Sequence, residues 1–99
     1  MAASATVDIG TLITRTPGVY GGRPCLAGTR FPVMQIALMH NEGLTPEQMT
    51  AEYSFLDLTA IYAAVAYYLA NKAAVDADIA EFERVGREGL AAQRARSTQ

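Results

Sequence analysis

The chain has 99 residues, which is enough for one compact core and too few for two. Its composition, 51% hydrophobic and 18% charged, is that of a folded globular protein and excludes a disordered chain. The formal net charge of −2 argues against a generally basic coat for nucleic acid. A single cysteine excludes an intramolecular disulfide and a cysteine-based zinc site, so we expect a cytoplasmic protein.

The apolar residues are spread along the chain. No apolar run approaches the ~20 residues that span a bilayer, so we expect no membrane association. We expect a flexible lead-in over residues 1–10, one domain over residues 11–90 and a disordered tail over residues 91–99. With one histidine and no cluster of carboxylates at ligand spacing, the sequence predicts no enzyme, no metal site and no cofactor.

The first part of the domain is an irregular, basic arm. A short strand is predicted at residues 12–15, and a tight hairpin at residues 25–31 with Gly28 at its positive-φ position. Three arginines and no acid lie between Arg15 and Arg30, whereas residues 42–57 hold four acids and no Lys or Arg. The arm is therefore the candidate for contact with an anion.

Two helices follow the arm. Pro32 suits the first position of a helix and Gly43 suits the position just past its end. Thr45, with a proline after it and Gln48 three residues on, has the pattern of a capping box and opens the second helix. This second helix is predicted to end near Tyr53.

A third helix is predicted to begin after Asp57 and to run to about Ala70. A turn of roughly three to four residues separates it from the second helix, a length typical of helix-turn-helix units. Its predicted buried stripe consists of Ile61, Ala64, Val65, Tyr68 and Leu69. Its opposite face is predicted to hold Thr59, Tyr62, Ala63 and Ala66.

A fourth, amphipathic helix is predicted beyond Asn71, ending near Gly86 or Gly89. Its apolar residues are Val75, Ile79 and Phe82, and Glu83 and Arg87 are spaced as an i, i+4 pair. These apolar residues either close the small core or face a partner. We expect them to bind a partner, because a small three-helix core buries limited area.

Residues 21–33 read GGRPCLAGTRFPV. This segment resembles the GG(R/K)P…GTR(I/F)PV signature of the DUF433 proteins, a family of small bacterial homeodomain-like domains. A second block, from Gly43 to Tyr68, resembles the family's YP.LT…I..AL.YY pattern, with Ser54 in place of the common proline and Asp57 in place of the common threonine. The cap is kept, because Asp is at least as good an N-cap as Thr.

The predicted fold is mainly α: a homeodomain-like three-helix helix-turn-helix with a short N-terminal β arm or hairpin and a C-terminal amphipathic helix. The resemblance implies an antitoxin-like role, since many such proteins are encoded beside a PIN-like ribonuclease toxin that they bind and restrain, while their helix-turn-helix binds operator DNA. The first two turns of the third helix carry no Lys or Arg. Useful affinity for DNA therefore requires a homodimer.

The candidate DNA-binding residues are Arg23, Thr29, Arg30, Thr59 and Tyr62. Arg23 and Arg30 have an alternative role, since either could pair with the acids of the second helix, Glu47 and Glu52. The tyrosine could simply pack. The main rival to the DNA-binding function is a protein-interaction module that keeps the scaffold without binding DNA, and a third possibility is a small enzyme or ligand-binding domain with an anion site in the arm.

Overall fold

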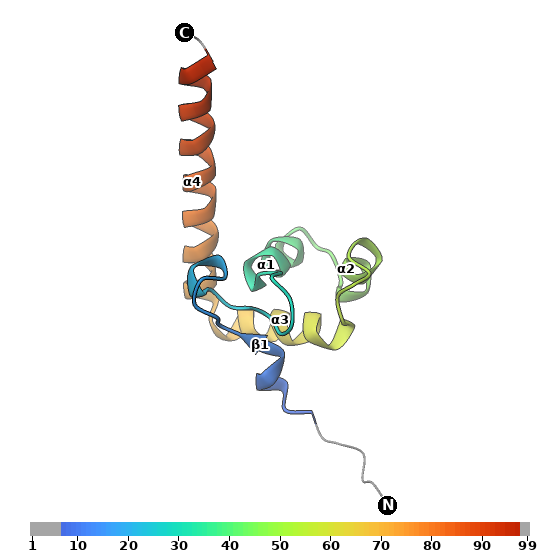
Figure 1. Ribbon diagram of the computed structural model, residues 1–99. Helices are drawn as coiled ribbons and strands as arrows, with labels where there is room; N and C mark the ends of the chain where they lie inside the picture. The colour runs from blue at the N-terminus through green and yellow to red at the C-terminus, as the bar shows by residue number, and fades with distance from the viewer. Residues whose placement is uncertain (1–6, 98–99) are drawn as a thin grey trace, which may run out of the picture.

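The computed structural model describes residues 7–97, and it is mainly helical (Figure 1). The arm holds two 3-10 turns, η1 (Ile9–Leu12) and η2 (Tyr20–Gly22), and two strands, β1 (Ile13–Thr14) and β2 (Cys25–Leu26). Four helices follow: α1 (Val33–Asn41), α2 (Pro46–Glu52), α3 (Leu58–Ala70) and α4 (Lys72–Ser97). In Figure 1, α1 and α2 lie over α3, and α4 extends away from this packed part as a single long helix.

The β element of the arm is a small antiparallel pair. Strand β1 pairs with β2 in the register Ile13 to Leu26. Beyond β2 the chain turns back at once, because the backbone N–H of Leu26 donates to the carbonyl of Phe31 at 2.9 Å. Gly28, at φ 74°, occupies the positive-φ position that the sequence predicts for this turn. The prediction of a short strand and a tight turn is confirmed.

The caps of the first three helices follow the predicted signals. Gly43 has φ 93° and lies just past the end of α1. Pro32 is the N-cap residue of α1, whereas the sequence predicted it at the first helical position. In α2 the Thr45 hydroxyl accepts from the N–H of Gln48 at 3.2 Å, and the Gln48 side chain accepts from the N–H of Thr45 at 2.8 Å. The Asp57 carboxylate caps α3 by accepting from the N–H of Thr59. These caps fix the length of the α2–α3 turn.

Helix α3 is buried over a different arc from the predicted one. Ile61, Ala64 and Tyr68 are buried as expected, but Leu69 is 58% exposed, and Ala63, predicted to lie on the face opposite the buried stripe, is buried. The reason is that α3 contacts α1 and α2 and also η1, β1 and β2 of the arm. A second layer on the alanine side moves the buried arc away from Leu69.

One hydroxyl joins three helices. The Tyr68 hydroxyl on α3 donates to Asp76 of α4 at 2.8 Å and accepts from the Asn41 amide of α1 and the Lys72 ammonium of α4, both at 3.1 Å. The hydrogen bond from Tyr68, and then that from Lys72, lowers the pKa of Asp76. The carboxylate therefore stays charged and holds the start of α4 against α3.

Helix α4 is longer than predicted. It continues to Ser97, past Gly86 and Gly89, where the sequence predicts its end. Each glycine costs a helix roughly 1 kcal/mol relative to alanine. The helix continues through both glycines because the residues around them have high helix propensity. The predicted tail, residues 91–99, overlaps the last turns of α4, while residues 98–99 and the first part of the predicted lead-in, residues 1–6, lie outside the described residues.

The three predicted partner-binding residues of α4 have different environments. Val75 and Ile79 are 1% and 9% exposed and belong to the core, whereas Phe82 is 52% exposed. Val75 and Ile79 thus have the alternative role, closing the core of this chain, because they lie on the two turns of α4 that still cover α1 and α3. No helix in the described part of the chain is long and apolar enough to cross a bilayer.

Replacing Tyr68 with Phe tests the three-helix junction. We expect Tyr68→Phe to lower the free energy of unfolding by about 1–2 kcal/mol, because three polar partners lose a shared hydrogen-bonding group. Urea titration measures this. Tyr67→Phe, which removes a hydroxyl from the neighbouring half-buried tyrosine, is the control. Equal losses in the two variants would contradict the junction.

Candidate functional site: an aromatic groove beside the arm

A groove of about 490 Å³ lies where the arm, the start of α1, the α2–α3 turn and α4 meet. Most of its lining residues are aromatic, and the buried residues Pro32 and Met34 also line it. The aromatic and charged residues that line it are Tyr20, Arg30, Phe31, Tyr53, Phe55 and Phe82. It is therefore built by segments that are far apart in the sequence.

The aromatic residues of this chain are gathered in the groove rather than in the core. All three phenylalanines and two of the five tyrosines line it. Among the largest fully buried side chains, in contrast, Tyr68 is the one aromatic. Phe31 and Tyr53 are half-buried, with their rings edge to face at 4.9 Å, and Phe55 is 68% exposed. An aromatic cluster that remains accessible after folding is a candidate binding surface.

Arg30 is the charged residue of the groove. Its side chain is exposed, and it makes no hydrogen bond or ion pair with the described residues. In particular, it does not reach Glu47 or Glu52, the acids proposed for it from the sequence. Its guanidinium is available to an anion that enters the groove.

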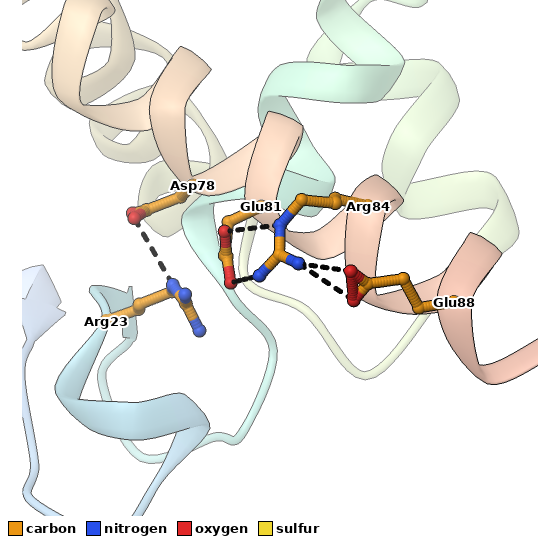
Figure 2. Close-up of polar contacts among 5 residues, drawn as sticks. All are labelled: Arg23, Asp78, Glu81, Arg84 and Glu88. Carbon is orange, nitrogen blue, oxygen red and sulfur yellow. Dashed lines mark hydrogen bonds and ion pairs between the residues drawn. The ribbon is translucent and has the colours of Figure 1, made fainter.

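Arg23, in contrast, has a structural partner. Its Nε lies 3.2 Å from Asp78 Oδ1, and the two side chains are 34% and 28% exposed (Figure 2). Pairing with the acids of α2 is the wrong alternative, because η2 places Arg23 beside α4 instead. The ion pair ties the arm to α4 across 55 positions of sequence.

A second set of ion pairs runs along α4 next to this contact. The Arg84 guanidinium lies between Glu81 and Glu88, with a distance of 2.6 Å from Nη1 to Glu88 Oε1 (Figure 2). The hydrogen bond from Arg84 lowers the pKa of Glu81. The predicted pair of Glu83 and Arg87 is not among the ion pairs of the described residues. The Arg84 pairs support α4 where its neighbours no longer cover it.

Two of the predicted DNA-binding residues have their polar atoms engaged. The Thr29 hydroxyl donates to the carbonyl of Leu26 at 2.8 Å and accepts from the N–H of Phe31, so it shapes the turn. The Tyr62 hydroxyl donates to Glu47 at 2.6 Å, and this hydrogen bond lowers the pKa of Glu47 and raises the pKa of Tyr62. A carboxylate thus lies beside the exposed face of α3.

Thr59 is exposed on the first turn of α3. Of the five candidate DNA contacts, Thr59 and Arg30 are therefore the ones whose side chains remain free of other described partners, while the polar atoms of the other three make contacts within the chain. Arg30 lies with Phe82 in the groove. The sequence assigned these two residues to different partners, DNA and protein, and the structure brings them together.

The remaining candidates for chemistry do not form a site. Cys25 is buried, and burial raises the pKa of its thiol, which keeps it protonated. No group of three or more His, Cys, Asp or Glu side chains that could hold a metal occurs within the part of the chain that the structure describes. The groove is accordingly the candidate functional site of the described residues.

Residues 13–68 match the family described as "Protein of unknown function (DUF433)", and this match covers more than half of the chain. The chain belongs to the DUF433 family. It is also similar to the crystal structure of a DUF433 member protein from Anabaena variabilis ATCC 29413, at 33% sequence identity and a TM-score of 0.65, over 71% of this chain and 69% of that chain. The comparison with curated proteins finds no match.

The matched segment of this DUF433 protein ends at Tyr68, before α4 begins. Phe82 therefore comes from outside the family match, whereas Arg30 and the other aromatic lining residues from Tyr20 to Phe55 lie within it. Sequence reasoning missed those four aromatics as site residues. The available signal was their position, since Phe31 and Phe55 lie in turns rather than in the apolar stripe of a helix.

A double-mutant cycle on Arg23→Ala and Asp78→Ala tests the tie between the arm and α4. We expect a coupling energy of about 0.2–1 kcal/mol in urea unfolding, because the pair is partly exposed and screened by solvent. The same cycle on Arg84 and Glu88 is the control, since that pair lies within α4 alone. In the first cycle only, we expect hydrogen exchange at residues 20–23 to accelerate. Unchanged exchange there would show that the arm is held by other contacts.

Proposed function

We propose that this DUF433 protein is an antitoxin-type regulator whose C-terminal helix and groove hold a partner protein, a PIN-like ribonuclease toxin, and whose helix-turn-helix contacts operator DNA as a homodimer. The observation that carries this proposal is the stretch of α4 over residues 80–89, most of which is exposed. Beyond Ile79 this helix presents Phe82 and Val85, which are 52% and 53% exposed. Large apolar side chains at regular helical spacing outside a domain are typical of a helix that binds into a partner's groove.

The same stretch of α4, residues 80–89, also has room for close approach. Gly86 and Gly89 follow Phe82 at i+4 and i+7, on the same face of the helix. A side chain at either glycine would meet nothing within 4 Å. In proteins, most of the stability of a helix comes from packing one of its faces against a neighbour rather than from helix propensity. A partner that covers this face would supply the packing that the domain does not.

DNA binding is the second half of the proposal, and the capped α2–α3 turn supports it. Tyr53 to Asp57 separate the two helices, which is close to the short turn of helix-turn-helix units. Thr59 is exposed at the start of α3, where recognition helices contact bases or phosphates. With few free side chains on each copy, binding would depend on two copies acting together.

The alternative is a protein-interaction module on this scaffold that does not bind DNA. The Tyr62–Glu47 hydrogen bond favours it, because the bond places a charged carboxylate next to the would-be recognition face. The engagement of Arg23 with Asp78 favours it as well. Partner binding is common to both functions, so DNA binding is the property that distinguishes them.

Val85→Asp tests the partner-binding half. We expect it to weaken the proposed complex with a PIN-like nuclease by about tenfold or more, because a charge would replace an apolar contact residue. Isothermal titration measures the affinity. Ala80→Asp adds the same charge at an exposed position on the other side of α4 and is expected to leave binding unchanged. Equal effects, or a wild type that forms no complex, would contradict this half.

Thr59→Asp tests the DNA half. We expect it to reduce binding to a duplex of the chain's own promoter about tenfold or more, because an added carboxylate repels phosphate and Asp is tolerated in the first turn of a helix. Fluorescence anisotropy at two salt concentrations measures binding, and Ala73→Asp on α4 is the control. If the wild type shows no salt-sensitive binding, the protein-interaction alternative holds.

A further inference from the structure

We propose that the groove binds an acidic peptide segment, in which an apolar side chain enters between the aromatic rings and a neighbouring carboxylate pairs with Arg30. The inference deepens the partner-binding half of the proposed function, on which it rests, by naming the chemistry of the segment that the partner inserts. It also assigns Arg30 to protein recognition, whereas the sequence alone assigns this residue to DNA.

The apolar part of the site is already formed in the free chain. Phe31 and Tyr53 pack against the core from one side and against each other edge to face, at 63° between the ring planes. Phe55 is in edge contact with both, with ring centroids 6.2 and 6.3 Å away. Rings that are held by their neighbours lose little conformational freedom on binding, so they are effective contact residues. Aromatic residues and arginine are also the side chains that most often dominate the energy of protein interfaces.

The charge of the site selects an anion. Among the residues whose side chains are described, Arg23, Lys72 and Arg84 each lie beside a carboxylate. Arg15, Arg30 and Arg87 do not, and of these three Arg30 is the one that lines the groove. No acidic residue lines the groove. A guanidinium with no acid nearby, at the edge of an apolar surface, gains most from a carboxylate that its ligand brings, because the pair is partly shielded from water.

A peptide fits these observations better than a nucleic acid does. Grooves for single strands combine aromatic platforms with several cations that follow the phosphate backbone. Here the lining includes a single cation, and the chain as a whole has a net charge of −2. A peptide with one carboxylate next to one apolar side chain would complement a groove with one arginine next to several aromatic rings. The volume of the groove, about 490 Å³, is within the size range of ligand sites.

The test uses the full-length protein and a displayed library of random peptides of about ten residues. We expect the selected peptides to be enriched in Asp or Glu next to an apolar or aromatic residue. A fluorescent copy of the strongest peptide is then titrated against variants. Arg30→Gln and Phe55→Ala, both at exposed positions, should each weaken binding about tenfold. Arg87→Gln removes an exposed arginine of α4 that does not line the groove and should have no effect.

Several outcomes would overturn the inference. One is a selection that gives no binder or no enrichment in acidic residues. A second is an equal effect of Arg30→Gln and Arg87→Gln on peptide binding, and a third is displacement of the peptide by an oligothymidine strand. A fourth is loss of self-association in Arg30→Gln, which would make the groove an interface between two copies. Val85 lies outside the groove lining. If Val85→Asp disrupts the toxin complex while no acidic peptide is selected, this inference fails and the proposed function stands. If acidic peptides are selected while Val85→Asp leaves the toxin complex unchanged, this inference stands and the proposed role of α4 fails.

Discussion

The close packing of α3 against two layers is the constraint on which the rest of the structure depends. Ala60, Ala63 and Ala64 are buried, and such small side chains allow α1 on one side and the arm on the other to come near the helix axis. A core of this kind has room for few large rings, and Tyr68 is the aromatic that it buries fully. The remaining large rings lie further out, and all three phenylalanines line the groove.

Helix α4 belongs partly to this core and partly to the surface. Val75 and Ile79 cover α1 and α3, and the Tyr68 hydroxyl together with the Arg23–Asp78 pair fixes the first turns of the helix to the domain. Phe82 is one turn further on: it is the α4 residue that lines the groove, and with Val85 it is one of the exposed apolar residues of this helix. The groove and the projecting helix therefore form one continuous surface rather than two separate ones.

Local signals predicted most of the fold. The Gly28 turn, the Thr45 capping box and the Asp57 cap are encoded by neighbouring residues, so their positions could be found without tertiary information. The buried arc of α3 and the end of α4 could not, because they depend on what packs against each helix. The site was harder still: Arg30 and Phe82 are 52 positions apart by number, and their meeting depends on the path of the arm, which an ion pair to α4 holds in place.

The pairing of charged side chains within the chain bears on which ligand it can bind. The sequence left the acids of α2 as alternative partners for the arginines of the arm, but Glu47 accepts from Tyr62 and Arg23 pairs with Asp78 of α4. The guanidinium of Arg23 is thus engaged within the fold, and the carboxylate of Glu47 lies beside the exposed face of α3. This negative charge makes the face less suited to contact a phosphate backbone. Arg30 is left as the cation beside an apolar surface, where a single carboxylate is the better complement. A partner that filled the groove would also touch Phe82, so the same contact would fix the direction in which α4 projects.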